Sequence, residues 1–177
     1  MEMEGDYVRR TYANDETIFK EGDRAGEAYL VHSGEVRLHK MEDGEDHEID
    51  VVGKGQIFGE MGVMSDMNRM ATATAIGDTV LTCCHRRELV RRMDALDEDR
   101  RDALRFLIVY CQEFLPYELM GNRPNDTETK NRDKLAYFLV RDAEKPGELD
   151  SLDTLLRGLY KVLVSYAKRR IPPGFEP

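Results

Sequence analysis

The feature that most constrains the fold is an alternation of apolar and polar side chains, with a period of two residues, that runs from Val8 to His85. Turn residues such as Ser33-Gly34 and Asp43-Gly44 interrupt this alternation at spacings of about ten residues. This pattern is typical of β-strands that bury one face in a sandwich, a jelly roll or a barrel. We therefore expect this half of the chain to be all-β, with about eight short strands.

The sequence changes after His85, where helix formers replace the alternation. Residues 86–115 contain no Gly or Pro and carry apolar side chains three and four residues apart, which predicts one long helix. Pro116 is expected to end or kink that helix, and residues 121–125 are a predicted loop. Two further helices are predicted over residues 126–142 and 150–170, and their candidate N-caps are Asp126 or Thr127 and Asp150 or Ser151.

These patterns predict a mainly β protein with an α-helical appendage. Its parts are a β-roll over residues 1–86, a long helix over residues 87–120 and a C-terminal helical region over residues 126–177. The apolar face of the long helix either pairs two copies of the chain, as a homodimer through residues 87–115, or folds back onto the chain's own roll. This face includes Leu104, Ile108, Cys111 and Leu115.

The net charge of −9 is carried by the first half of the chain. Residues 1–86 contain 9 Lys or Arg against 18 Asp or Glu, whereas residues 126–177 contain 10 against 9. Neither half has the basic excess that binding to the phosphate backbone of nucleic acids normally needs. We therefore expect no nucleic-acid partner.

The apolar segments and the cysteines indicate a protein of a reducing compartment. No apolar run reaches the roughly 18 residues that a membrane-spanning helix needs, and the acidic N-terminal segment lacks the apolar core of a signal peptide. We therefore expect a cytoplasmic protein with no membrane partner and with reduced thiols. The three cysteines cannot form a paired disulfide framework; they are Cys83, Cys84 and Cys111.

One short segment carries the clearest functional pattern. It reads Phe58-Gly59-Glu60, places Arg69 nine residues after the Glu and continues with small residues that enter a strand. This segment resembles the phosphate-binding cassette of the cyclic-nucleotide-binding domain family, which includes bacterial catabolite activators and kinase regulatory subunits. Matches at Phe19–Asp23 and Ala28–Val36 extend the resemblance to about residues 8–86. It implies an eight-stranded jelly roll (a double-stranded β-helix).

The resemblance implies that the cassette binds a cyclic nucleotide, and simple chemistry suggests the role of each residue. The guanidinium of Arg69 is a planar, permanently charged fork that can meet two phosphate oxygens. Backbone amides at the start of a short helical turn offer partial positive charge to an anion. Gly59 permits close approach of that backbone, and the amide of Met61 is expected to join it. The carboxylate of Glu60 is a hydrogen-bond acceptor, which suits a ribose 2′-hydroxyl, and Glu60 and Arg69 are expected to steady each other.

The residue after the arginine bears on the choice of base. The family often has Ser or Thr there, which can donate to the phosphate or to the guanine of cGMP, whereas Met70 has no donor. Met70 and Ala71 complete the expected contacts, and we expect cAMP as the ligand rather than cGMP. Asn68 and Gly62 also depart from the family pattern, in which Pro and Ala are common at these positions.

Catalytic and metal-binding patterns are missing from the sequence. There is no nucleophile elbow, phosphate-binding loop or metal signature, so we expect neither an enzyme nor a metal site. The histidines lie on different predicted strands or turns without the spacing of metal ligands; they are His32, His39, His47 and His85.

Three interpretations of the function follow. The first is a regulatory protein that binds cAMP and relays this binding through its C-terminal helices to a protein partner. The second is a divergent transcription regulator of the catabolite-activator type, against which the near-neutral tail and the missing recognition-helix pattern argue. The third is a degenerate roll that no longer binds nucleotide.

Overall fold

The computed structural model describes residues 3–4, 7–120, 127–147, 149–150 and 152–175, and of residues 3, 4, 7, 65 and 112–120 it describes the backbone alone. These residues divide into two compact units, Met1–Arg92 and Met93–Pro177. The predicted loop over residues 121–125 and the candidate caps Asp126 and Ser151 lie outside the described residues. The side chain of Leu115 lies outside the described side chains.

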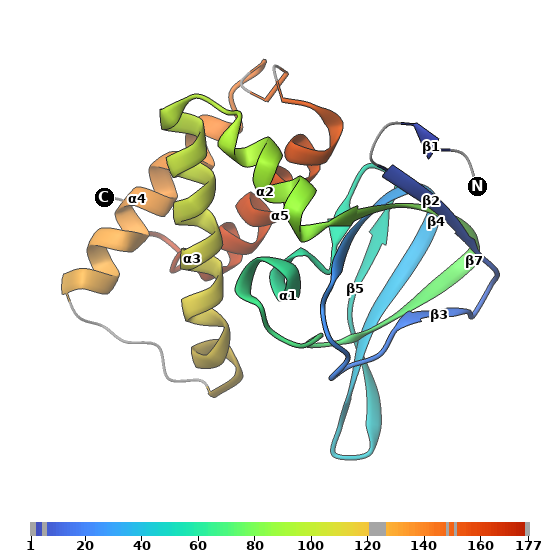
Figure 1. Cartoon of the computed structure of the whole chain (residues 1–177). Helices are drawn as coiled ribbons and strands as arrows, with labels where there is room; N and C mark the ends of the chain where they lie inside the picture. Colours follow the sequence, from blue (N-terminus) through green and yellow to red (C-terminus); the bar gives the residue numbers. More distant parts are fainter. Residues whose placement is uncertain (1–2, 5–6, 121–126, 148, 151, 176–177) are drawn as a thin grey trace. The chain divides into compact units, whose positions relative to one another are not determined.

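An antiparallel sheet of seven strands forms most of the described part of the first unit (Figure 1). The hydrogen-bonded order is β1-β2-β7-β4-β5, while β3 also pairs with β7 and β6 also pairs with β4. Two helices, α1 and α2, follow β6 and β7 respectively. The elements are β1 (Met3–Glu4), β2 (Tyr7–Tyr12), β3 (Thr17–Phe19), β4 (Glu27–Glu42), β5 (Glu45–Gly53), β6 (Ile57–Phe58), α1 (Glu60–Ser65), β7 (Thr72–His85) and α2 (Arg86–Asp94).

The prediction of a mainly β fold followed by helices is confirmed. Seven strands appear among the described residues where about eight were predicted, because β4 and β7 are 16 and 14 residues long. The two strands pair through register shifts on either side of Ser33. Ser33-Gly34 was predicted to be a turn between two strands. In the structure it is an irregularity within one continuous strand, β4.

Three aromatic rings of the hydrophobic core lie beside the predicted cassette. Phe58 of β6 is 1% exposed and stacks on Tyr29 of β4, with ring centroids 5.2 Å apart. Phe19 of β3 packs on both, with centroids 5.8 Å from Tyr29 and 6.0 Å from Phe58. Aromatic contacts of this kind hold three strands together immediately before the cassette. The other buried members of this cluster are Val31, Val36, Val52, Ala73, Leu81 and Cys83.

The second unit contains the helices α3 (Glu98–Met120), α4 (Thr127–Ala143) and α5 (Thr154–Arg170). The helix predicted over residues 86–115 is interrupted, because Asp97 accepts a hydrogen bond from the backbone N–H of Arg100 at 3.1 Å and so caps a new helix. Pro116 does not end α3, which continues to Met120; a proline removes one helical hydrogen bond, and here the helix tolerates that loss.

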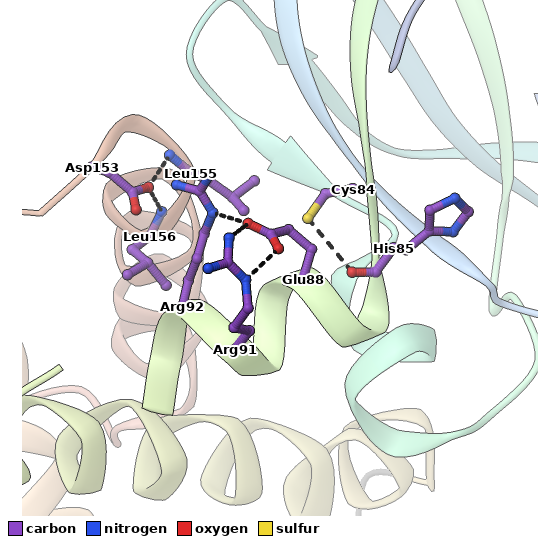
Figure 2. A network of polar contacts seen from close by, with 8 residues as sticks. All are labelled: Cys84, His85, Glu88, Arg91, Arg92, Asp153, Leu155 and Leu156. Atoms are coloured by element: carbon purple, nitrogen blue, oxygen red, sulfur yellow. Dashed lines mark hydrogen bonds and ion pairs between the residues drawn. The ribbon is translucent and has the colours of Figure 1, made fainter. Parts of the chain in front are cut away.

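The helix α5 begins later than predicted. Its N-cap is Asp153, whose carboxylate accepts hydrogen bonds from the N–H groups of Leu155 at 2.9 Å and Leu156 at 3.1 Å (Figure 2). The predicted candidate Asp150 lies in the preceding turn. Thr127, a predicted cap, is the first residue of α4.

The apolar face of α3 is buried within the helical unit. Leu104 and Cys111 are 0% exposed and Ile108 is 6% exposed. The Sγ of Cys111 lies 3.6 Å from the carbonyl oxygen of Leu163 on α5. Three residues of the face that the sequence offered for a homodimer are therefore buried within the chain, and Cys111 among them contacts a helix of the same unit.

The buried stripe of α4 is partly polar. It contains Asp133, which is 3% exposed and accepts a hydrogen bond from the hydroxyl of Tyr110 at 2.7 Å. Leu135 of the same helix is 45% exposed. None of the described helices is both long and apolar enough to cross a bilayer.

Gly34 provides a test of the irregularity in β4. Its φ is +83°, and a Cβ added there would lie 2.4 Å from Oγ1 of Thr79 and 2.7 Å from the carbonyl oxygen of Asp78. Gly34→Ala should therefore lower the free energy of unfolding by about 2–4 kcal/mol, measured as a lower Tm. Gly44→Ala is the matched control, because its φ is +85° with nothing within 4 Å. Equal losses in the two variants would contradict this account.

Candidate functional site

The predicted cassette is a tight turn, a six-residue helix and a second tight turn. Gly59 is the N-cap of α1 with φ of +71°, and Asp66 is its C-cap with φ of +56°. The backbone N–H of Asp66 bonds to the carbonyl oxygen of Gly62. A Cβ on Gly62 would lie 2.7 Å from the Cβ of Ala25. The departure from the family's alanine at this position therefore fits the close approach of α1 to Ala25.

The main chain of Arg69 is fixed by the segment that precedes β4. Its N–H donates to the carbonyl oxygen of Asp23 at 2.8 Å, and its carbonyl oxygen accepts from the N–H of Gly22 at 2.8 Å. The neighbouring residues Arg24 and Asn68 form an isolated antiparallel bridge. The backbone of the predicted phosphate-binding residue is thus held by a segment that lies about 45 residues earlier in the sequence.

The guanidinium of Arg69 is held by two backbone carbonyls and one aromatic ring. Its Nη1 donates to the carbonyl oxygen of Gly59 at 2.7 Å, and its Nη2 donates to that of Glu27 at 2.6 Å. Its Cζ lies 4.0 Å from the centroid of the Phe19 ring and 5.5 Å from that of Tyr29. Hydrogen bonds and cation–π contacts together fix the orientation of the fork.

Gly59 serves this arrangement through its missing side chain. A Cβ there would lie 2.6 Å from Nη1 of Arg69 and 3.3 Å from Cε1 of Phe19. Gly59 was predicted to let its backbone approach the ligand closely. In the structure, the group that approaches this backbone is the guanidinium of Arg69. The structure brings Gly59 and Arg69 into direct contact.

Arg69 retains unused donor capacity. The residue is 5% exposed, and its Nε has no hydrogen-bond partner among the described residues. Burial lowers the pKa of the guanidinium from its ordinary value. A guanidinium has five N–H groups, so it can keep both carbonyl contacts and still offer a fork to an anion.

Glu60 is the second buried polar residue of the cassette. It is 1% exposed, and its Oε1 has no hydrogen-bond partner among the described residues. Burial raises the pKa of this carboxyl to about 7, while its own backbone N–H and the charge of Arg69 act in the opposite direction. Within the described residues no hydrogen bond or ion pair joins Glu60 to Arg69. The mutual steadying predicted for this pair is thus an attraction through space only.

The remaining predicted site residues flank these two. Met61 is 8% exposed in the first turn of α1. Met70 and Ala71 are half-buried and connect Arg69 to β7. The hydroxyl of Thr72, the first residue of that strand, accepts from the N–H of Glu21 at 3.1 Å.

Three residues that position Arg69 were not among the predicted site residues. Phe19 and Tyr29 lie in the two upstream matching segments, so their motif membership was a usable signal. Glu27 contributes a backbone carbonyl. Every residue has a backbone carbonyl, so the pattern of side chains in the sequence could not indicate this role.

Outside the cassette, an acidic residue of α2 is paired with two arginines of the same helix. In α2 the carboxylate of Glu88 accepts hydrogen bonds from Arg91 at 2.7 Å and from Arg92 at 2.6 Å, which lowers its pKa to about 2 (Figure 2). Among the described residues no group of three or more His, Cys, Asp or Glu could hold a metal ion. The three cysteines are buried free thiols.

Comparisons with known proteins show what the first half of the chain is similar to. Residues 9–95 match the family model described as "Cyclic nucleotide-binding domain". The chain is 36% identical over 91 residues to the "Cyclic AMP receptor protein" of Thermus thermophilus, a match that covers 49% of this chain and 42% of that protein. It is 37% identical over 73 residues to the "cAMP-dependent protein kinase type II regulatory subunit" of Drosophila melanogaster, covering 41% of this chain and 19% of that protein.

Solved structures share the fold. The halfsite-occupied form of the EAL enzyme Bd1971 matches with a TM-score of 0.55 and 27% identity, over 60% of this chain and 96% of that chain. The chain spans less than half the length of the two curated relatives. Those relatives are named as a receptor and a regulatory subunit, whereas the structural neighbour is named as an enzyme.

The raised pKa of Glu60 predicts how stability depends on pH. Well below pH 4.5 the carboxyl is protonated in both the folded and the unfolded chain, so its burial does not lower the free energy of unfolding through ionisation. Between there and about pH 7 the unfolded chain ionises first, so the ligand-free fold loses roughly 3 kcal/mol in total. In Glu60→Gln this loss should disappear, which urea unfolding from pH 4.5 to 8 would measure. Glu48→Gln, at a mainly exposed site, is the control; parallel curves for wild type and Glu60→Gln would contradict the prediction.

Proposed function

We propose that the cassette of this chain binds cAMP and that the protein is a regulatory receptor, because residues 9–95 match the family model of the cyclic nucleotide-binding domain. The observation that carries the proposal is a pair of buried polar atoms without partners among the described residues, Nε of Arg69 and Oε1 of Glu60. Buried polar atoms normally have partners. A donor and an acceptor of this kind match the phosphate oxygens and the ribose hydroxyl of a nucleotide.

Arg69 binds the cyclic phosphate in this proposal. Its contacts to the carbonyls of Gly59 and Glu27 leave Nε and further N–H groups for two phosphate oxygens. Because these contacts and the Phe19 ring already orient the guanidinium, little side-chain freedom is lost on binding.

Glu60 accepts a hydrogen bond from the ribose 2′-hydroxyl. A ligand hydroxyl would satisfy the buried Oε1, which has no partner among the described residues. A deoxyribose offers no such donor, so the site would favour ribonucleotides. Met61, Met70 and Ala71 complete the contacts around these two residues.

The proposed preference for cAMP rests on Met70 and on the relatives. Met70 cannot donate the hydrogen bond that a hydroxyl residue at this position offers to guanine. The two curated relatives named above carry cyclic AMP or cAMP in their names. Both observations favour cAMP over cGMP.

The proposed role is regulatory rather than catalytic. The last strand of the roll runs directly into α2, and α2 is followed after three residues by α3. A change at the cassette that displaces α2 would reach the helical unit, which would present it to a protein partner in the cytoplasm. The shift that cAMP can produce is limited by its difference in affinity for the two states.

Two alternatives from the sequence are less well supported. A homodimer through residues 87–115 would have to use other surfaces than Leu104, Ile108 and Cys111, which are already buried. A DNA-binding role lacks a basic surface excess, since residues 126–177 carry 10 basic against 9 acidic side chains. We therefore favour a protein partner.

The direct test is calorimetric titration of the nucleotide-stripped chain with cAMP. We expect binding at micromolar concentration or tighter, weakened at least about 100-fold in Arg69→Ala because two charge-assisted hydrogen bonds are lost. Arg69→Lys keeps the charge without the fork and should also bind weakly. Arg37→Ala, which removes an ion pair with Asp46 elsewhere on β4, is the control. No heat with cAMP or cGMP in the wild type would identify a degenerate roll.

The preference between the two nucleotides has its own test. Met70→Thr restores a hydroxyl donor and should tighten cGMP binding by about 3- to 10-fold, with cAMP affinity changed less. Met70→Val is the control, because valine has a shape similar to that of threonine but has no hydroxyl. Equal effects of both substitutions on cGMP affinity would refute the assignment of Met70 as a selectivity residue.

A further inference from the structure

Glu27 touches the cassette through its main chain and the end of the roll through its side chain. It is the first residue of β4, and its carbonyl oxygen accepts from Nη2 of Arg69 at 2.6 Å. Its carboxylate, which is 13% exposed, pairs with Arg10 of β2. It also lies 3.4 Å from Nε2 of His85. One residue thus connects the phosphate-binding arginine to the last residue of β7.

The pair between Glu27 and Arg10 has the geometry of a fixed contact. Nη1 of Arg10 donates to Oε2 at 2.6 Å, and Nη2 donates to Oε1 at 3.0 Å. Two parallel bonds of this kind define the direction of both side chains. The hydrogen bond to Glu27 raises the pKa of Arg10 above its ordinary value.

The strand pairing makes this contact a bridge across three strands. Arg10 of β2 is opposite Leu81 of β7, and Glu27 of β4 is opposite His85 of β7. β7 therefore lies between the two partners, and their ion pair crosses the part of this strand between Leu81 and His85. A shift of Glu27 relative to β2 would act on the residue that immediately precedes α2.

Tyr29 provides a second connection between the same two groups. Its ring centroid lies 5.5 Å from Cζ of Arg69, and its hydroxyl donates to Oε2 of Glu27 at 3.4 Å. Burial raises the pKa of Tyr29 to about 12, which keeps this hydroxyl protonated. The main chain and the neighbouring side chain both couple Glu27 to the guanidinium.

We propose that Glu27 is a positioning residue that aims Arg69 with its carbonyl and transmits the position of Arg69 to the start of α2 with its carboxylate. The inference rests on the proposed function, since it needs a ligand that engages Arg69. It assigns the coupling to the carboxylate clamp of Glu27, Arg10 and His85, outside the cassette.

Hydrogen–deuterium exchange on the full chain, with and without saturating cAMP, tests this proposal. In the wild type, cAMP should change exchange at residues 85–92. Glu27→Gln retains the backbone carbonyl and loses the charged clamp. It should bind cAMP within about tenfold of the wild type, with the cAMP-dependent change at residues 85–92 reduced to about half or less. Arg10→Gln removes the partner of the clamp and should have the same effect.

The control is Glu42→Gln, on the same strand and with an exposed ion pair to Lys40. It removes the same charge and should leave the cAMP-dependent exchange at residues 85–92 unchanged. A wild-type response in both Glu27→Gln and Arg10→Gln would overturn the inference while leaving the receptor function standing. A wild type that binds cAMP without any change at residues 85–92 would also overturn it. Failure of the wild type to bind cAMP would remove the proposed function and this inference with it.

Discussion

The structure of the roll depends on the burial of one permanently charged side chain. Arg69 is 5% exposed, and a buried charge is costly unless hydrogen bonds and counter-dipoles surround it. Two carbonyls, one aromatic ring and a glycine without a Cβ meet this requirement. They come from three parts of the chain: β3, the start of β4 and the turn after β6, where Gly59 supplies both a carbonyl and the space of a missing Cβ. The strands must close correctly for the arginine to be accommodated at all.

This constraint explains why two upstream motifs accompany the cassette in the sequence. Phe19 lies under the guanidinium, while Gly22 and Asp23 hold the backbone of Arg69. Tyr29 packs on Phe19 and Phe58. The segments that occur together in the sequence pattern therefore meet around Arg69, through their contacts with it and with one another. The mainly β fold could be predicted from the alternation of apolar and polar residues, and the motifs named the segments that lie around Arg69 in the structure.

Other features could not be predicted, for physical reasons that differ. The carbonyl of Glu27 is a backbone atom, which every residue possesses, so its role leaves no trace in side-chain chemistry. The helix break at Asp97 depends on a single capping hydrogen bond within a segment of otherwise uniform helix formers. The buried stripe of α4 includes Asp133 because the hydroxyl of Tyr110 donates a hydrogen bond to it. A search for regularly spaced apolar residues cannot find a buried acidic residue whose hydrogen bond is made elsewhere in the fold.

The low exposure of the cassette has a consequence for the speed of recognition. Arg69 and Glu60 are 5% and 1% exposed, so little of either side chain is open to a solute in this form of the cassette. If encounter follows an opening of α1 and its flanking turns, the observed association rate would level off at high solute concentration, at the rate of that opening. The same closure would slow departure, so that a modest equilibrium affinity is compatible with a long residence time.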